Sequence, residues 1–253
     1  MSLLEMAAIL LAGLAAGTIN TVVGSGTLVT FPTLLAFGVP PVVANVSNTI
    51  GLAPGSVSGA IGYRRELRGQ RSRLIRLGSA SLIGGVIGAL LLLVLPEEAF
   101  RAIVPVLIGL GVLLVAFQPG VRAWVDRVGG GRTTPENGSW WVWVLVLLTG
   151  VYGGYFGAAQ GVLLVAILGI GLNETIQRNN ATKNVLAGLV NGVAALLFII
   201  IAEVDWAIAG LIAVGAVIGG QVGASVGRRL PPWLLRCVIV VVGCVALVSF
   251  ALG

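Results

Sequence analysis

The sequence predicts an all-α protein that crosses a membrane many times and is built from two inverted repeats. Of its 253 residues, 57% are hydrophobic and 9% are charged, whereas an ordinary soluble domain has roughly 25% charged residues. The apolar residues form successive long runs, and the runs of the second half repeat those of the first. A soluble globular protein is excluded, because a soluble fold of this size could not bury so much apolar surface.

The apolar runs, taken in chain order, predict either ten helices or eight full spans with two short segments. A helix needs about 20 apolar residues to cross the hydrocarbon core of a bilayer. The runs at 27–37 and 161–171 are too short for this, and each follows a glycine-rich break. Non-helical backbone at membrane depth is tolerated only where protein buries it or where it lines a wet cavity. The runs are 3–23, 27–37, 42–63, 74–95, 99–118, 140–160, 161–171, 184–202, 206–227 and 233–252.

An internal repeat divides the chain into two halves. A shift of 137 residues places Gly24 on Gly161, and a shift of 135 places Asn45-Val46-Ser47 on Asn180-Ala181-Thr182. A register that holds over two full helices indicates a repeat. We therefore predict five-segment halves at 1–118 and 140–253, joined by a polar linker at 119–139, all within one transmembrane domain.

The arginines predict the orientation of the halves. The loop from Arg64 to Arg76 carries six arginines and one acid, Glu66, which makes it cytoplasmic by the positive-inside rule. Its counterpart in the second half, Glu203-Val204-Asp205, has no basic residue, whereas the following loop, Arg228–Arg236, has three arginines. The halves are therefore expected to be inverted, with the linker on the cytoplasmic side and both chain ends on the far side.

Charge and the available metal ligands narrow the range of partners. The chain has 15 basic and 9 acidic residues, an excess that in a soluble protein suggests nucleic acid. Here the basic residues cluster between apolar runs, so we expect them to contact lipid headgroups, and we expect no nucleic-acid partner. Histidine is absent and both cysteines lie in an apolar run, so no metal site and no cofactor are predicted. The oligomeric state is left open, with a homodimer among the states that the sequence allows.

Each half has one polar cluster at the start of its third segment. The two clusters are candidates for binding a small anion. On one interpretation their side chains cap helices at the membrane surface. On the other, two helix N-termini point inward and bind an anion together with the positive charges of Lys183 and Arg178. Glu174 is the local acid that could neutralise Lys183, and a further alternative is that Lys183 snorkels to the headgroups. The candidate residues are Asn45, Ser47 and Asn48 in the first half and Arg178, Asn180, Thr182 and Lys183 in the second.

Other polar residues lie at the glycine breaks or within apolar helices. At the breaks, Asn20, Ser25 and Gln160 either repair the backbone by hydrogen bonding or contact substrate. Asn191 and Gln221 are expected to form hydrogen bonds between helices, and glycines spaced by four residues at 84–88 and 215–227 are expected to allow close helix packing.

The glycine breaks and polar clusters occur in the same order in both halves. In this pattern the sequence resembles the sulfite exporter TauE/SafE family over essentially the whole chain. The resemblance implies an exporter of sulfite, sulfonates or related small sulfur-containing anions in the bacterial inner membrane. The residues that carry it are Gly13, Gly17, Gly24, Gly26, Pro32, Gly38, Ala44-Asn45-Val46-Ser47 and Gly55, and then Gly150, Gly154, Gly157, Gly161, Gly169, Asn180-Ala181-Thr182-Lys183 and Gly188.

Inverted repeats with a broken segment at matching positions are typical of secondary transporters. We therefore expect a small anion to be moved by alternating access, with a passive anion channel on the same scaffold as the alternative. An intramembrane enzyme is disfavoured, because no segment has an acid pair near its centre and no serine has a plausible base. No catalytic residue is predicted.

Overall fold

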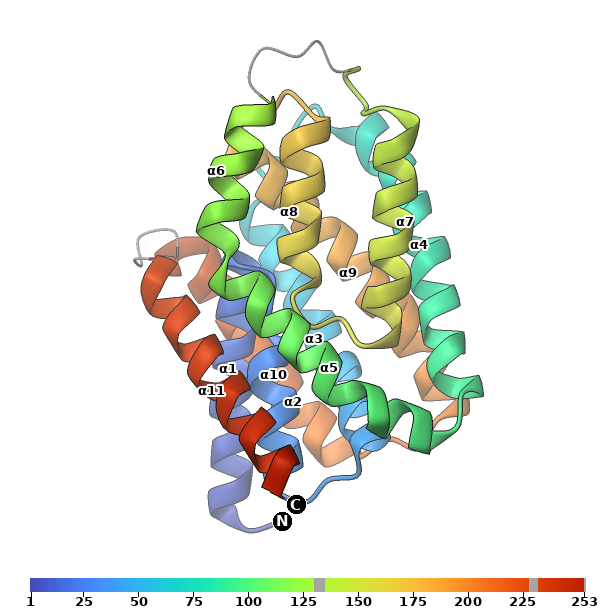
Figure 1. The fold of residues 1–253 in the computed structure, drawn as a ribbon, viewed down its shortest axis with the longest axis vertical. Helices are drawn as coiled ribbons and strands as arrows, with labels where there is room; N and C mark the ends of the chain where they lie inside the picture. Colours follow the sequence, from blue (N-terminus) through green and yellow to red (C-terminus); the bar gives the residue numbers. More distant parts are fainter. Residues whose placement is uncertain (130–134, 228–231, 253) are drawn as a thin grey trace.

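The computed structural model describes residues 1–129, 135–227 and 232–252, and its regular structure in these ranges is helical (Figure 1). The predicted all-α fold is confirmed. The helices are α1 (Leu3–Val22), α2 (Thr27–Ala36), α3 (Pro41–Gly62), α4 (Arg71–Val94), α5 (Glu97–Ala116), α6 (Gln118–Gly129), α7 (Trp140–Tyr155), α8 (Gln160–Gly171), α9 (Ile176–Ile201), α10 (Trp206–Val222), which continues as a π-helical turn (Gly223–Gly227), and α11 (Pro232–Leu252).

Several helices begin at residues whose side chains satisfy the free backbone N–H groups of the first turn. Ser2 and Glu5 form a capping box at the start of α1, in which the Ser2 hydroxyl accepts a hydrogen bond from the Glu5 N–H at 3.2 Å. The Asp205 carboxylate accepts hydrogen bonds from the N–H groups of Ala207 and Ile208 at the start of α10. The first turns of α1 and α10 are therefore fixed by side-chain hydrogen bonds from neighbouring residues.

Five helices of the described chain are long and apolar enough to cross a membrane: α1, α4, α5, α9, and α10 with the first residues of its π-helical extension. Shorter apolar helices accompany them, so the chain is a multi-pass membrane protein. The run predicted at 140–160 is interrupted earlier than expected. Helix α7 ends at Tyr155, because Gly157 and Ala159 adopt left-handed backbone conformations with φ of 77° and 58°.

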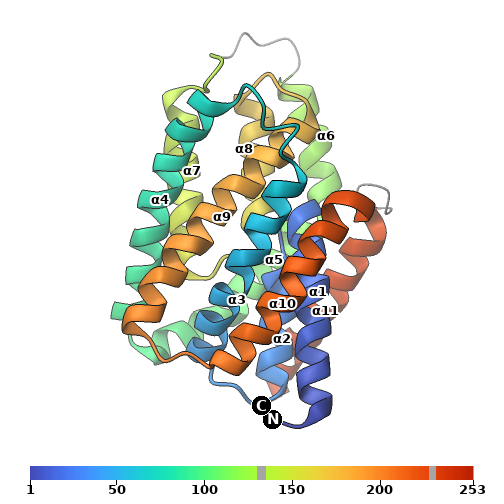
Figure 2. The same ribbon diagram turned by 180° about the vertical axis from the view of Figure 1, so that it is seen from behind.

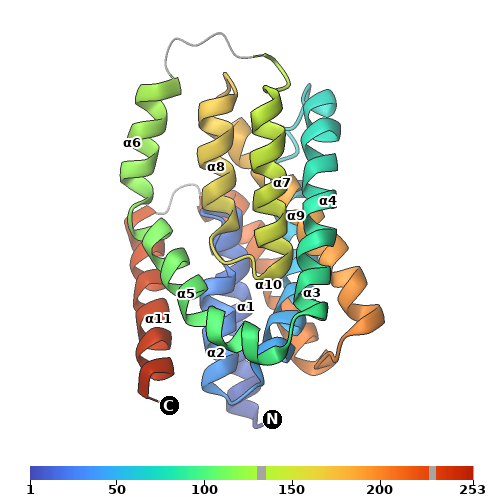
Figure 3. The ribbon, with the colours of Figure 1, turned by 45° about the vertical axis from the view of Figure 1, so that its right-hand side comes forward.

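The polar stretch predicted as the linker at 119–139 is partly helical. Its first residues form α6, which stands alongside α8 at the upper end of the molecule (Figure 3). Gly130, Gly131 and Arg132 of the linker lie outside the described residues, as do Arg228 and Arg229 of the second basic loop.

Small residues hold two helix pairs at backbone contact, as the glycine spacing predicts. A Cβ atom at Gly219 of α10 would overlap the Leu14 carbonyl oxygen of α1, and one at Gly88 of α4 would overlap the Val151 carbonyl oxygen of α7. The Thr18 hydroxyl also donates a hydrogen bond to the Gly219 carbonyl at 3.1 Å. The close-packing interpretation of these glycines is confirmed.

The two polar residues expected to join helices do so. Asn191 of α9 donates its amide hydrogen to the Ser56 hydroxyl of α3 at 3.2 Å. Gln221 of α10 donates to the carbonyl and the hydroxyl oxygen of Ser58, also on α3, at 2.8 and 2.9 Å. Helix α3 is therefore hydrogen-bonded to α9 on one side and to α10 on the other.

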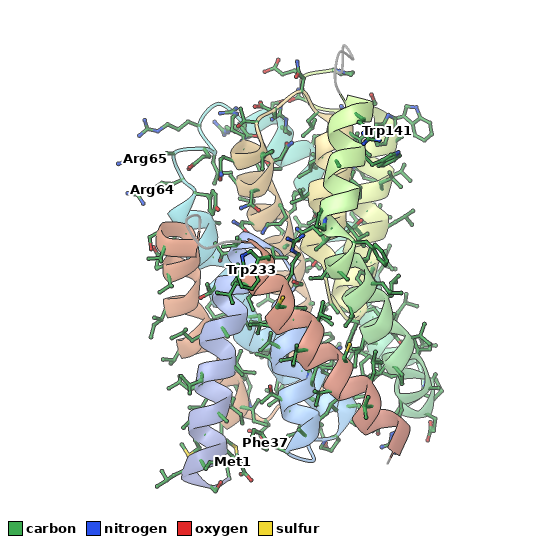
Figure 4. The ribbon with its side chains drawn as sticks, turned by 60° about the vertical axis from the view of Figure 1, so that its left-hand side comes forward. Met1, Phe37, Arg64, Arg65, Trp141 and Trp233 are labelled. Atoms are coloured by element: carbon green, nitrogen blue, oxygen red, sulfur yellow. The ribbon has the colours of Figure 1, made fainter. Side chains whose placement is uncertain are left out.

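Helices α3 and α9 lie side by side in the middle of the bundle, with α1 and α10 on one side and α4 and α7 on the other (Figure 2). Both chain ends lie at the lower end (Figure 1). Arg64 and Arg65 project at the opposite end, away from Met1 (Figure 4). The chain ends thus share one end of the molecule, opposite the Arg64–Arg76 loop, while the side of the membrane that each end faces stays a prediction.

Candidate functional site

The two glycine breaks meet in the middle of the molecule. The Gly161 N–H donates a hydrogen bond to the Gly24 carbonyl at 2.9 Å, and a Cβ atom on either glycine would overlap the Cα atom of the other. Gly24 has a φ of 91°, which L side chains rarely adopt. From this contact α2 runs toward the lower end and α8 toward the upper end (Figure 3). The N-termini of two short helices, which are the positive ends of their dipoles, therefore lie at mid-depth.

This arrangement corrects the predicted pair of helix N-termini. Helix α3 begins at Pro41 and α9 begins after its N-cap residue Thr175, both near the ends of the molecule. The polar residues Asn45, Ser47, Asn48, Asn180, Thr182 and Lys183 lie inside these helices. They therefore cap neither helix, and the central N-termini belong to α2 and α8, which the glycine breaks could have indicated.

Lys183 is fully buried and bound to backbone. Its side chain is 0% exposed, and its ammonium nitrogen Nζ donates hydrogen bonds to the carbonyl oxygens of Asn20 at 2.8 Å and Thr21 at 3.1 Å. These carbonyls belong to the last turn of α1, the negative end of that helix dipole. The snorkelling alternative is wrong, because Lys183 does not reach the surface. Glu174 is bound to arginines instead, as described below.

Asn45 and Asn180, which the repeat aligns, make similar contacts. Asn180 donates its amide hydrogens to the Thr21 carbonyl at 3.3 Å and to the Tyr63 hydroxyl at 2.9 Å. Asn45 donates to the Tyr155 carbonyl at 2.9 Å. Each asparagine thus binds the final turn of the first helix of the other half. Their Oδ1 atoms have no hydrogen-bond partner within the described part of the chain.

Asn48 aligns with Lys183 in the repeat, but its partners are different. Its Oδ1 accepts a hydrogen bond from the Thr30 hydroxyl, and its amide nitrogen lies 3.5 Å from the Thr27 hydroxyl. Both threonines belong to the short helix α2. The first half therefore holds a neutral amide against α2 where the second half holds a cation against α1.

Ser25 and Gln160 are buried at the breaks with unused hydrogen-bonding atoms. Their side chains are 1% and 3% exposed, and neither Ser25 Oγ nor Gln160 Nε2 has a partner among the residues that the structure describes. A buried polar group left without a partner costs about 1–3 kcal/mol. Asn20 lies nearby, and its amide is 3.5 Å from the Ser56 hydroxyl, the outer limit for a hydrogen bond. The breaks therefore hold polar atoms that are free to bind a ligand.

Three predicted site residues lie away from this centre. The Ser47 hydroxyl accepts a hydrogen bond from the Asp205 N–H at 3.0 Å and so holds the α9–α10 connection at the lower end. The Thr182 hydroxyl donates to Gln70 Oε1 at 3.0 Å. The Arg178 guanidinium is 2.6 Å from Glu174 Oε2, so its charge is neutralised there. The expectation that Arg178 joins Lys183 in one site is therefore wrong.

An ion-pair network closes the upper end between the two halves. Arg73 at the start of α4 is 5% exposed, and its guanidinium lies 2.9 Å from Glu174 and 2.7 Å from the Gln70 side-chain oxygen. Burial raises the pKa of Glu174, but the hydrogen bonds and charges of Arg178 and Arg73 outweigh it and leave the pKa below its ordinary value. Sequence reasoning treated Arg73 only as a topology signal and assigned Arg178 to the anion site, and so it missed the network.

An aromatic cluster packs at the second break. Phe31 of α2, Phe100 of α5, and Tyr155 and Phe156 at the end of α7 meet edge to face, with ring centroids 5.0–6.4 Å apart. The three phenylalanines are buried. This aromatic cluster joins α2 and α5 of the first half to the end of α7 in the second half.

Comparisons with known proteins agree with this architecture. Residues 9–250 match the family model described as sulfite exporter TauE/SafE. A probable membrane transporter protein, YfcA of Escherichia coli strain K12, is 30% identical over 241 residues, covering 91% of this chain and 83% of the relative. The probable membrane transporter protein ORF9 of a Sinorhizobium species is 27% identical over 242 residues, covering 94% and 88%. A probable membrane transporter protein of Haemophilus influenzae is 23% identical over 235 residues, covering 90% and 88%.

Proposed function

The chain belongs to the sulfite exporter TauE/SafE family of membrane transporters, and from this premise we propose that it exports a small sulfur-containing anion, such as sulfite or a sulfonate, by alternating access. The family description supports the class of substrate. The observation that carries the proposed site is a pair of buried atoms, Ser25 Oγ and Gln160 Nε2, that lack a hydrogen-bond partner in the described structure. They lie beside the N-termini of α2 and α8, which are at mid-depth.

The proposed site supplies hydrogen-bond donors and one buried positive charge. A sulfur oxyanion has several acceptor oxygens, which suit the Ser25 hydroxyl and the Gln160 amide. Lys183 packs against the same contact, since a Cβ atom at Gly161 would come within 2.9 Å of the Lys183 side-chain carbon Cδ. The partners of the Lys183 ammonium are carbonyl oxygens rather than a carboxylate. Its charge is therefore not cancelled by an acid and attracts an anion to the breaks.

We further propose that residues 1–118 and 140–253 are inverted repeats that rock against each other. Two observations support this. Helix α1 of the first half packs on α10 of the second, while α7 of the second half packs on α4 of the first. The aligned helices α1 and α7 also run in opposite directions, upward and downward in Figure 1. Rocking of such repeats about a central site is the usual basis of alternating access.

We propose that the ion-pair network and the aromatic cluster are the two closures, or gates, that block access to the central site from either side. A substrate in the centre has Arg73 and Glu174 on the upper side and Phe31, Phe100 and Phe156 on the lower side. Export then requires that the upper closure opens first and the lower closure second. Because the upper closure joins the two halves, its opening is coupled to their relative motion.

A binding measurement on the purified protein tests the site. Thermal-shift titration with sulfite, sulfate, thiosulfate, taurine and sulfoacetate identifies a ligand, since a ligand that binds only the folded state raises its melting temperature. We expect Ser25→Ala and Gln160→Ala to weaken its binding by roughly tenfold or more, the effect of one hydrogen bond to a charged group. Ser81→Ala is the matched control, because Ser81 Oγ in α4 is also buried and lacks a partner in the described structure. Equal affinity for all three variants contradicts the site.

A transport measurement separates the proposal from the alternative of a passive anion channel. Protein reconstituted into vesicles is given the labelled anion under an imposed proton or sodium gradient. A secondary transporter coupled to that ion accumulates the anion beyond its own electrochemical equilibrium, whereas a channel cannot. Fractionation of bacterial cells tests the proposed location in the inner membrane.

A further inference from the structure

An apolar groove lies on the surface at the lower end of the molecule. Its volume is about 840 Å³, and it runs between the connection from α2 to α3 and the second half of α11. Val241 and Val245 from α11 contribute exposed apolar side chains to its walls, and the partly buried Phe37 contributes from the connection. Figure 4 shows Phe37 at the end of the molecule that holds Met1 and lies opposite Arg64 and Arg65.

The charged residues at the end of this groove carry both signs. Arg101 lines the groove and also a smaller adjoining hollow of about 340 Å³, which it shares with Glu97 and Glu98. The Arg101 guanidinium is 3.6 Å from the Glu97 carboxylate, and both side chains are more than half exposed. An exposed pair of this kind contributes at most about 1 kcal/mol. Arg101 can therefore leave Glu97 and bind another anion at little cost in free energy.

We propose that this groove binds one phospholipid with a zwitterionic headgroup that ends in a primary amine, as in phosphatidylethanolamine. An acyl chain fills the apolar groove. The lipid phosphate accepts hydrogen bonds from the Arg101 guanidinium, whose planar donors match a phosphate. The lipid ammonium group donates hydrogen bonds to the carboxylates of Glu97 and Glu98.

The position of the charges fits a lipid better than other occupants. Glu97 is the first residue of the spanning helix α5, so the charged cluster lies at the level where the apolar segment begins. Two carboxylates beside one guanidinium disfavour an anionic lipid, and they also disfavour the sulfur anion proposed as substrate. A headgroup with one positive and one negative charge complements both signs, and its apolar tail continues directly into the groove.

Native mass spectrometry of the full chain in detergent tests the proposal. The protein is mixed with equal amounts of phosphatidylethanolamine, phosphatidylcholine and phosphatidylglycerol that have distinguishable masses. We expect one bound phosphatidylethanolamine, retained about tenfold more than either competitor. Arg101→Gln should weaken its binding ten- to a hundredfold, the range for a charge-assisted hydrogen bond. Glu97→Gln combined with Glu98→Gln should remove the preference over phosphatidylcholine and leave the binding of phosphatidylcholine unchanged.

The control is Arg65→Gln, since Arg65 is an exposed arginine at the opposite end of the molecule. It should bind lipid as the unaltered protein does. The proposal is overturned if phosphatidylglycerol is preferred, if Arg101→Gln retains as much lipid as Arg65→Gln, or if a dimer without lipid replaces the monomer, which would make the groove an interface between two copies. Because Arg101 is exposed, its replacement leaves the core intact, and monodisperse elution of the variant verifies this.

Discussion

Substitution of a single glycine in α10 tests how closely the helices from the two halves approach. Gly219 lies against α1, where a Cβ atom would overlap the Leu14 carbonyl oxygen and come within 2.9 Å of the Thr18 nitrogen. Ordinary van der Waals contact for a Cβ atom begins at 3.4 Å. Gly219→Ala therefore requires the backbones of α1 and α10 to separate by on the order of 1 Å, a distance set by the Leu14 carbonyl oxygen, because backbone atoms, unlike a flexible side chain, cannot turn aside.

The cost of this separation is expected to be about 3 kcal/mol. Overpacking of a well-packed interface costs typically 1–3 kcal/mol, and a backbone obstacle places Gly219→Ala at the upper end of that range. The hydrogen bond from the Thr18 hydroxyl to the Gly219 carbonyl also lengthens. Alanine gains up to about 1 kcal/mol over glycine in helix propensity. Gly210→Ala measures this gain alone, because Gly210 is on the same helix and a Cβ atom there would have no neighbour within 4 Å.

The assay is the melting temperature of the purified protein, followed by size-exclusion chromatography after heating. Gly210→Ala should melt at or slightly above the temperature of the unaltered protein, and Gly219→Ala should melt several degrees lower. If the two variants melt together, α1 and α10 do not pack at backbone contact, and the explanation of the glycine spacing fails.

Three further predictions concern the charged groups. Single cysteines at Arg64 and in the Arg228–Arg236 loop should resist an impermeant thiol reagent in intact cells; rapid labelling of either position would refute the predicted cytoplasmic orientation. Glu174→Gln should lower the melting temperature at neutral pH. The pKa of Glu174 is lower in the folded protein than its unfolded value of about 4.3, so the carboxylate stabilises the protein fully above that value and loses this effect only as the pH falls through the lower folded pKa. The difference in melting temperature should therefore persist down to about pH 4 and shrink below it; a difference that is constant with pH would contradict the ion-pair role. Lys183→Met should leave the melting temperature unchanged or raise it, because the fully buried ammonium has lost its hydration and is bound to neutral carbonyl oxygens, whereas Met is an apolar side chain of similar volume. Asn184→Ala, which removes one neutral hydrogen bond to the Thr21 carbonyl, should lower it. A lower melting temperature for Lys183→Met than for Asn184→Ala would show that the cation stabilises the end of α1.

The sequence was sufficient to predict the apolar helices, the two short segments and the close packing of the glycine faces, but not helix α6 in the polar linker. These features follow from local composition and spacing, since apolar run length decides a span and a four-residue glycine period marks one helix face. The short helices α2 and α8 begin within one residue of the predicted runs at 27–37 and 161–171.

The position of the polar residues within their helices was harder to predict. Asn45 and Asn180 were expected near helix starts because polar residues often mark such starts. In the structure Pro41 and Thr175 begin or cap the helices earlier, so that the polar side chains face the centre of the bundle. The pairing of Arg73 with Glu174 joins residues 101 positions apart, which no local pattern reveals.

The contact between Gly24 and Gly161 has a mechanical consequence for the proposed motion. Backbone touches backbone there, and the Gly161 N–H donates a backbone hydrogen bond across the contact. Such a joint lets one half swivel on the other while its centre stays fixed, whereas sliding would separate the glycines and break the bond. The point about which the halves turn then coincides with the proposed anion site. The bound ion would stay nearly stationary while the walls around it move.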